Sequence, residues 1–192
     1  MMKKLTAVLF ALMLALSCLP VAVAEAQPAE PASHILVVYF SATGTTRGVA
    51  EKLAEGLSAD LYEIVPEQPY TDADLNYNDR KSRTSIETDD PSCRPAIAGE
   101  LPDLTAYDTV FIGYPIWWGD VPRIVSNFVE KVELTDKTLA VFFTSGSSGL
   151  GSSMKHLEQQ AGAGTWLEGK RFTGRTTAEE LTNWAKGLGI EP

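Results

Sequence analysis

Short apolar runs alternate with longer amphipathic stretches from residue 34 onward. Apolar runs that predict β-strands occur at residues 35–40, 61–65, 109–114, 138–143 and 165–167. Stretches with the spacing of an amphipathic helix lie at residues 47–57, 122–132, 152–160 and 177–188. This alternation is typical of parallel strands joined by crossover helices. The chain is therefore predicted to be an α/β protein, a three-layer α/β/α sandwich around a five-stranded parallel sheet.

The segment 66–107 interrupts this pattern. It is polar and is interrupted by Pro69, Pro91, Pro95 and Pro102, so only one short helix, over residues 74–85, is expected within it. A connection of this length in a compact domain is usually functional or mobile. Further along the chain, Thr177 and Glu180 have the spacing of a capping box at the start of the last helix.

The first 24 residues have the pattern of an export signal. Lys3 and Lys4 precede an apolar stretch over residues 5–16, and small residues at 22–26 supply cleavage sites. An uncleaved membrane anchor and a lipid-modified Cys18 are the alternatives. Residues 25–33 form a Pro/Ala-rich spacer, and residues 34–192 the domain. We therefore expect an extracytoplasmic protein, in the periplasm, at the cell surface or secreted, which meets a membrane only through this signal or a lipid anchor.

Composition and charge exclude several functions. The 192 residues carry a formal charge of −9, which argues against a nucleic-acid partner because phosphate binding needs a basic face. Two cysteines, Cys18 and Cys93, exclude a disulfide-rich scaffold and a zinc site of several thiolates. The two histidines, His34 and His156, have no metal-ligand spacing, so surface or capping roles are expected. No metal site and no catalytic residue is assigned, and Cys93 is expected to be inert.

The loop that follows the first strand has the composition of a phosphate site. It opens directly into a helix, where backbone N–H groups, hydroxyl donors and a glycine favour an anion. The loop has no lysine, which favours a monophosphate over a nucleoside triphosphate. An ordinary helix cap is the alternative. The candidate residues are Ser41, Ala42, Thr43, Gly44, Thr45 and Thr46.

Two further loops leave the same edge of the predicted sheet. The loop after the third strand contains two adjacent tryptophans, which are costly to leave in water and suit the wall of a cleft. The loop after the fourth strand is rich in glycine and serine and allows close backbone approach to a ligand edge. A planar ring with a phosphorylated tail would satisfy all three loops. The candidates are Pro115, Ile116, Trp117, Trp118, Gly119 and Asp120 in one loop, and Thr144, Ser145, Gly146, Ser147 and Gly149 in the other.

These three loops resemble the flavin mononucleotide (FMN) loops of the flavodoxin family, over residues 35–188. The resemblance implies a sheet of order 2-1-3-4-5 and FMN as cofactor. It implies that the first loop holds the phosphate and that Trp118 stacks on the isoalloxazine ring. It also implies that the Gly119 peptide turns to accept a hydrogen bond from the N5–H of the reduced ring, which suits a residue free to adopt positive φ.

One departure from that family bears on function. Typical flavodoxins cover the outer flavin face with a tyrosine from the third loop, where this chain has Gly149 or Leu150. The outer face is then open, or covered by Tyr77 or Trp117. The leading hypothesis is an exported electron carrier that serves a redox partner protein or a small-molecule acceptor. The alternatives are an FMN-dependent quinone or small-molecule reductase, and a flavin-free partner-binding module.

The two remaining tryptophans are assigned to the core. Trp166 lies on the last predicted strand and Trp184 on the last predicted helix. Because a strand and the helix after it pack against each other in an α/β sandwich, the two rings are expected to pack together.

Overall fold

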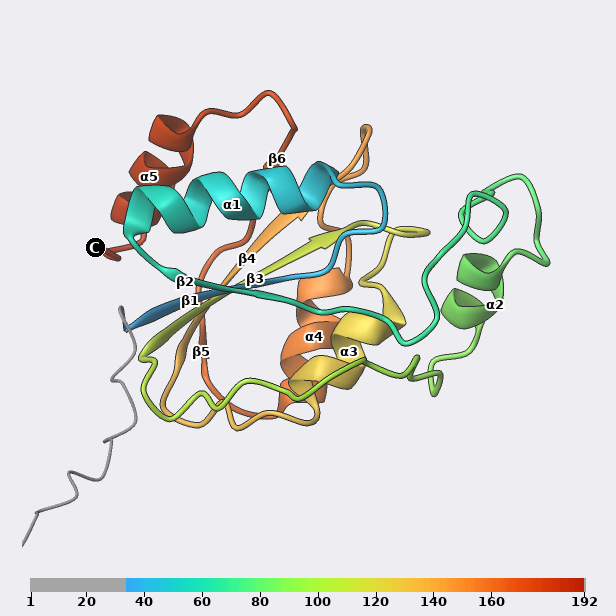
Figure 1. Cartoon of the computed structure of the whole chain (residues 1–192), viewed down its shortest axis with the longest axis horizontal. Coiled ribbons are helices and arrows are strands. Elements are labelled where there is room, and N and C mark those ends of the chain that lie inside the picture. Colours follow the sequence, from blue (N-terminus) through green and yellow to red (C-terminus); the bar gives the residue numbers. More distant parts are fainter. Residues whose placement is uncertain (1–33, 192) are drawn as a thin grey trace, which may run out of the picture.

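The computed structural model describes residues 34–191, which form an α/β sandwich (Figure 1). The predicted export signal and spacer, residues 1–24 and 25–33, lie outside this range. The elements follow the expected alternation. The strands are β1 (Ile35–Tyr39), β2 (Asp60–Glu63), β3 (Thr109–Pro115), β4 (Thr138–Thr144), β5 (Thr165–Trp166) and β6 (Lys170–Phe172). The helices are α1 (Thr45–Leu57), α2 (Arg83–Asp89), α3 (Arg123–Val129), α4 (Ser153–Ala161) and α5 (Ala178–Gly187).

The sheet is parallel and runs in the order β2-β1-β3-β4-β5, with β6 paired to β4. This confirms the predicted order and adds a short strand to it. β5 pairs with the start of β4 and β6 with its end. Between β5 and β6, the backbone at Gly169 lies so close to Leu150 and Met154 that an added Cβ would come within 3.3 and 3.4 Å of their side chains. Two short strands, β5 and β6, thus pair with β4 where the sequence predicts a single fifth strand.

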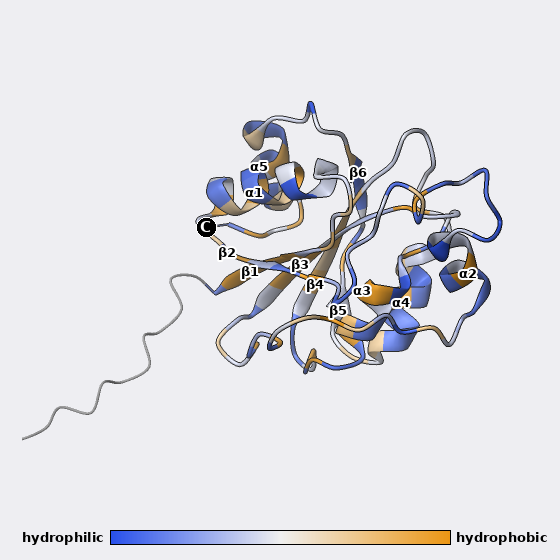
Figure 2. Ribbon diagram, turned by 45° about the vertical axis from the view of Figure 1, so that its right-hand side comes forward, coloured by the Kyte–Doolittle hydropathy of each residue, from blue (hydrophilic) through white to orange (hydrophobic). Residues whose placement is uncertain are grey.

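Two hydrophobic cores lie on the two faces of the sheet. Ile35, Val37 and Tyr39 of β1 face α1 and α5, whereas Leu36 and Val38 belong to the core on the side of α3 and α4. This alternation follows from the two-residue period of a strand, and it explains why the run is apolar at every position. Figure 1 shows α1 and α5 on one side of the sheet and α3 and α4 on the other. In Figure 2, β1 and α3 are hydrophobic, whereas the loops around α2 are hydrophilic.

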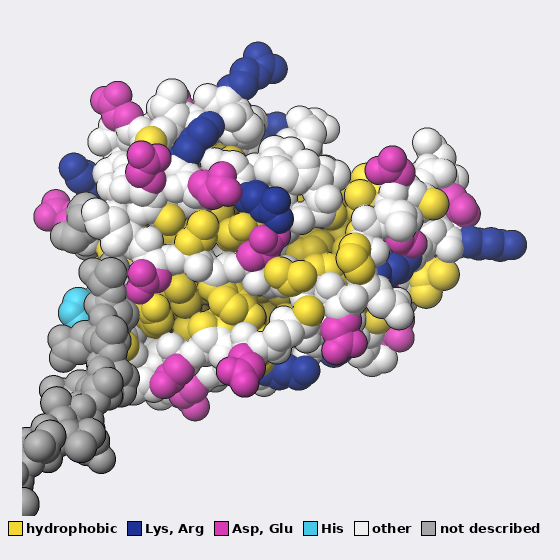
Figure 3. Space-filling view, viewed as in Figure 1, with side chains coloured by type: hydrophobic (Ala, Val, Ile, Leu, Met, Phe, Trp, Pro, Cys, Tyr) yellow, Lys and Arg dark blue, Asp and Glu magenta, His cyan; other side chains and the backbone are white. Residues whose placement is uncertain are grey.

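The edge of the sheet formed by β2 is less well covered. Leu61 and Val65 are each 43% exposed, and Figure 3 shows hydrophobic side chains among acidic ones on this face of the molecule. None of the helices within residues 34–191 has both the length and the apolar character needed to cross a membrane.

The short helix expected at residues 74–85 begins later, at Arg83. Side chains close local turns in the preceding residues: Asp74 accepts hydrogen bonds from the backbone and hydroxyl of Thr71 at 2.8 Å, and Asp79 accepts one from the backbone N–H of Lys81 at 2.8 Å. Such bonds offer the backbone an alternative to a helix. The predicted helix over 122–132 is also shorter, with Pro122 as its N-cap.

The expected contact between Trp166 and Trp184 is wrong. Trp184 packs edge-to-face on Phe111 and Phe172, with ring centroids 5.5 and 5.1 Å apart, on the α1–α5 side of the sheet. Trp166 packs against the other core and donates its indole N–H to the carbonyl of Ala163 at 3.0 Å. The sheet separates the two rings.

The expected capping box at the start of α5 is confirmed. The Thr177 hydroxyl accepts from the Glu180 N–H at 3.2 Å, and the Glu180 carboxylate accepts from the Thr177 N–H at 2.8 Å. The two side chains thus satisfy two backbone donors at a helix end.

We expect Gly113→Ala to destabilise the domain, because an added Cβ would lie 2.0 Å from the Phe142 ring in the core. Such overpacking costs about 1–3 kcal/mol in the free energy of unfolding, measured by guanidinium denaturation. Gly48→Ala in α1 is the matched control, since nothing lies within 4 Å of its added Cβ. A helical glycine replaced by alanine stabilises by about 0.5–1 kcal/mol. Equal effects of the two substitutions would contradict the packing at Gly113.

Candidate functional site

A cavity of about 380 Å³ opens at the edge of the sheet where the strands end. It lies at the carboxyl ends of the strands, the place where open α/β sheets bind ligands. The loops after β1, β3 and β4 contribute to it, as do the segment before α2 and the end of β6. The lining residues are Thr43, Thr45, Leu75, Tyr77, Pro115, Ile116, Trp117, Thr144, Ser145, Gly146, Phe172, Thr173 and Gly174.

The first loop presents two hydroxyls to this cavity, those of Thr43 and Thr45. Gly44 is the N-cap of α1 with φ of 85°, and its N–H donates to the Ser41 hydroxyl at 3.1 Å. Thr46 is buried, and its hydroxyl lies 2.8 Å from that of Thr144. The Thr46 side chain therefore joins the first loop to the third, whereas Thr43 and Thr45 remain available to a phosphate.

The loop after β3 contains a two-residue turn. Trp117 and Asp120 exchange backbone hydrogen bonds of 3.0 and 2.9 Å across it. Trp118 and Gly119 occupy its centre with φ of 50° and 77°. Positive φ at both central positions is what a type I′ turn requires. The glycine adopts the conformation that the resemblance implies, but a bulky residue with positive φ is an outlier that costs roughly 1–3 kcal/mol.

The two tryptophans of this loop lie in different surroundings. Trp117 is buried, lines the cavity, and packs edge-to-face on Phe40 and Tyr70 with centroids 5.3 and 5.0 Å away. Trp118 lies beside the cavity and packs on Tyr77, with centroids 5.4 Å apart. Its indole N–H is buried, and no acceptor within residues 34–191 pairs with it. The loop thus holds an unsatisfied donor next to the cavity.

Tyr77 supplies an aromatic wall from the segment before α2. It is 47% exposed and lines the cavity together with Leu75. Trp118 packs beside it, and the Arg80 guanidinium lies 5.2 Å from the Trp118 ring centroid. Burial raises the pKa of Tyr77, so its hydroxyl stays protonated. Tyr77 and Trp117 are the two aromatic residues expected to cover an outer ring face, and both line the cavity.

The third loop contributes Thr144, Ser145 and Gly146 to the cavity, whereas Ser147 and Gly149 are not among its lining residues. The guanidinium of Arg171 in β6 donates to the carbonyls of Ser145 and Gly146 at 3.1 and 2.8 Å. These carbonyls are therefore already bonded, and β6 fixes the course of the loop.

Four lining residues are not predicted by the sequence pattern: Leu75, Phe172, Thr173 and Gly174. Leu75 is an isolated leucine in a polar segment. Thr173 and Gly174 repeat the hydroxyl-then-glycine order of Thr43 and Gly44. The first signal could have identified Leu75, and the second Thr173 and Gly174.

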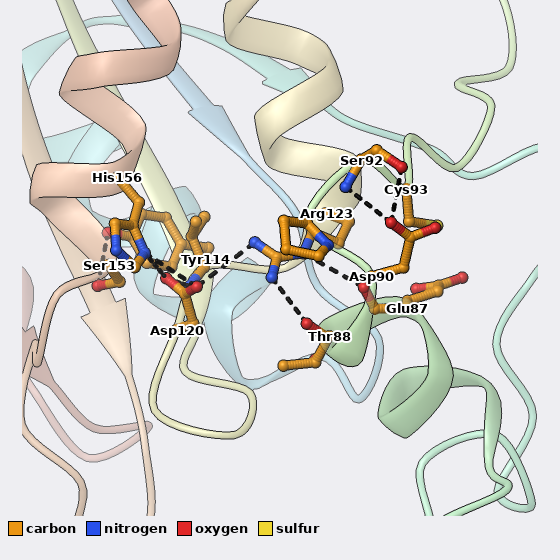
Figure 4. A network of polar contacts seen from close by, with 12 residues as sticks. Glu87, Thr88, Asp90, Ser92, Cys93, Tyr114, Asp120, Arg123, Ser153 and His156 are labelled. Atoms are coloured by element: carbon orange, nitrogen blue, oxygen red, sulfur yellow. Dashed lines mark hydrogen bonds and ion pairs between the residues drawn. The ribbon is translucent and has the colours of Figure 1, made fainter.

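Asp120 lies outside the cavity lining, and its carboxylate is used within the protein. The Nδ1 atom of His156 lies 3.0 Å from both carboxylate oxygens, and the Val121 N–H donates to one of them at 2.8 Å. Arg123 lies 3.4 Å away on the other side (Figure 4). His156, expected at the surface or at a cap, has a side chain that is 44% exposed and that also pairs with Asp120 of the loop after β3.

No charged side chain is among the residues that line the cavity. Hydroxyls, backbone groups and aromatic faces suit a planar ring whose anionic tail is bound by neutral donors, and in this respect the residues fit FMN. Across residues 34–191, no cluster of histidine, cysteine and carboxylate side chains has the arrangement of a metal site. Cys93 lies outside the cavity, and burial raises the pKa of its thiol.

Comparison with known proteins agrees with this site. A flavodoxin family model matches residues 34–188. A proposed flavoprotein from Bacteroides eggerthii is 45% identical, with a TM-score of 0.77, covering 82% of this chain and 98% of its own. A second, from Bacteroides uniformis, is 41% identical, with a TM-score of 0.75 and coverage of 79% and 97%.

A flavoprotein from Lactobacillus acidophilus, solved in complex with FMN, shares the fold at 22% identity and a TM-score of 0.61, covering 79% of this chain and 97% of its own. Comparison with curated proteins gives no match. The family match covers the whole described α/β sandwich except its last residues, including all three loops of the cavity. This chain belongs to the flavodoxin family.

Proposed function

We propose that this protein is an exported electron carrier that binds FMN in the cavity at the sheet edge and exchanges electrons with a redox partner protein or a small-molecule acceptor. The observation that carries the proposal is the meeting of Thr43 and Thr45 with Trp117 and Tyr77 around one uncharged cavity. Membership of the flavodoxin family and the FMN complex of the Lactobacillus acidophilus flavoprotein support FMN as the cofactor.

Each part of the cavity has a role toward this ligand. Thr43, Thr45 and the N–H groups at the start of α1 bind the phosphate. Trp117 and Tyr77 offer aromatic surface to the ring, and the third loop meets its edge through the main chain. FMN supplies the redox chemistry, and the protein supplies binding, orientation and electrostatics. An uncharged lining within a chain of net charge −9 disfavours added negative charge, which lowers the reduction potential.

The lining favours a carrier over a reductase. Among its residues, Tyr77 alone has a titratable side chain, and its pKa is raised by burial. The cavity therefore offers no side chain poised to transfer a proton to a substrate near neutral pH. Electron exchange through the partly exposed Tyr77 side of the cavity needs no such group. The proposed export, which follows from residues 1–24, would separate the carrier from cytoplasmic nicotinamide nucleotides.

We expect Thr43→Ala to weaken FMN binding by roughly tenfold or more, the effect of one lost hydrogen bond to a charged group. Binding of riboflavin, which lacks the phosphate, should not change. Titration calorimetry or flavin fluorescence measures both affinities. Thr165→Ala, an exposed threonine on β5, is the matched control and should leave FMN affinity unchanged. Equal weakening of FMN and riboflavin by Thr43→Ala would place the phosphate elsewhere.

The purified domain is expected to be yellow, because oxidised flavin absorbs blue light and FMN is the group that carries the redox chemistry. Absorption spectroscopy of the purified protein measures this. Mixed anaerobically with NADH, NADPH or a quinone, the protein should show no steady turnover, although dithionite should reduce it. A colourless protein that binds no added FMN would refute the cofactor. Rapid turnover of a nicotinamide nucleotide with a quinone would instead identify a reductase.

The mature protein is expected to begin near residue 25 and to be recovered outside the cytoplasm. Intact mass measurement of the protein from fractionated cells tests this. Replacing Lys3 and Lys4 with glutamate should retain the precursor in the cytoplasm, whereas replacing Lys131 and Lys137, which lie in the folded domain, should not. A full-length chain in the cytoplasmic fraction would contradict export.

A further inference from the structure

The carboxylate of Asp120 holds the strained turn of Trp118 and Gly119 in place. The Asp120 backbone closes the turn through two hydrogen bonds with Trp117, and the Asp120 side chain accepts a hydrogen bond from the Val121 N–H at 2.8 Å. The side chain is only 15% exposed, so its interactions are poorly screened by water. Because Trp118 occupies an unfavourable backbone region, the turn persists only where its surroundings fix it.

The first residues of α4 and the loop before it hold this turn from one side. His156 places Nδ1 at 3.0 Å from both oxygens of Asp120. Just before α4, a Cβ on Gly151 would lie 2.8 Å from the carbonyl oxygen of Gly119, so the backbone there touches the turn directly. Two independent contacts, one of side chains and one of backbones, therefore join α4 and the loop before it to Gly119 and Asp120 of the turn.

Arg123 holds the turn from the other side. Its guanidinium is 3.4 Å from Asp120 and donates to the carbonyls of Glu87 and Thr88, at the end of α2, at 3.2 and 2.8 Å. The Arg123 side chain is 8% exposed. Figure 4 shows His156 and Arg123 on opposite sides of Asp120. Of these two partners of Asp120, His156 is the imidazole, the side-chain type that changes charge near neutral pH.

We propose that His156 is a positioning residue for the cofactor turn: its charge state sets, through Asp120, how firmly the Trp118–Gly119 turn is held, and this adds a pH dependence to the reduction potential of bound FMN beyond that of the flavin's own proton uptake. This proposal rests on the proposed FMN binding. A protonated His156 places a positive charge on the turn's anchor, and a nearby positive charge favours the addition of an electron. The potential is therefore more positive when His156 is protonated.

The charged side chains that face His156 from neighbouring elements come from the loop after β3 and from α3. Asp120 faces it from the loop, and Arg123, which pairs with Asp120, is the only charged residue of α3. The hydroxyl of Tyr114 in β3 lies 3.2 Å from that of Ser153, and burial raises the pKa of Tyr114, so this tyrosine stays neutral. None of these neighbours is an imidazole, the side-chain type that changes charge near neutral pH.

The same is true of the charged residues on α4 itself. They are Lys155 and Glu158, and the ordinary pKa values of lysine and glutamate lie far from neutrality. Of the groups around the turn, His156 is thus the only imidazole, the side-chain type that changes charge between about pH 5 and pH 8. A pH response of the turn in this range is consequently assigned to His156.

The test is the reduction potential of the FMN-loaded protein from about pH 5.5 to about pH 8, the range in which a histidine changes charge. We expect the potential of wild type to rise above that of His156→Gln as the pH falls, and the two to converge at the alkaline end. His34→Gln is the matched control, because His34 is the other histidine of the chain and lies at the opposite edge of the sheet. Its potential should follow wild type.

A second measurement uses the cofactor-free protein, so that it remains informative if FMN does not bind. The indole N–H resonance of Trp118, assigned with Trp118→Phe, should move with pH in wild type and in His34→Gln but not in His156→Gln. A Trp118 signal with the same pH response in wild type and His156→Gln would overturn the proposal, as would parallel potential curves. Circular dichroism checks the fold of each variant, and His156→Asn makes the same comparison if His156→Gln is unfolded.

Discussion

The burial of the central strands on both faces is the constraint on which the rest of this structure depends. β1, β3 and β4 are covered by helices above and below, so their backbone polar groups must pair within the sheet. Parallel strands held in this way must end at one edge. The loops that follow them are thereby brought together, and contacts such as that between the Thr46 and Thr144 hydroxyls join loops that the sheet has already placed side by side. The cavity is a consequence of the sheet, and its chemistry is a consequence of the loops.

Much of the fold follows from local patterns. The continuous apolar run of β1 and the capping box of α5 are each read from residues only a few positions apart. The structure confirms both. The predicted position of α2 is wrong because Asp74 and Asp79 use their carboxylates to close turns, a preference that a helical pattern does not reveal. The separation of Trp166 from Trp184 depends on which face of the sheet each element packs against, and composition does not determine that.

The candidate site is predictable from sequence to the extent that its loops are unusual in composition. Thr43, Thr45 and Trp117 stand out by residue type alone, and they line one cavity. The pairing of Asp120 with His156 has no such signal, since the two are 36 positions apart in the sequence and each is unremarkable alone. The positive φ of Trp118 escapes prediction for a different reason, because a tryptophan gives no local sign of a left-handed backbone.

The uncharged lining has a consequence for where such a protein can work. Attraction between exposed ions weakens as dissolved salt accumulates around them, whereas hydrogen bonds from hydroxyls and peptide groups in a recess are screened far less. The affinity for a ligand bound by Thr43, Thr45 and the start of α1 should therefore change less with ionic strength than the affinity of a site built from lysine or arginine. Such donors would suit the extracytoplasmic setting that is proposed for this protein.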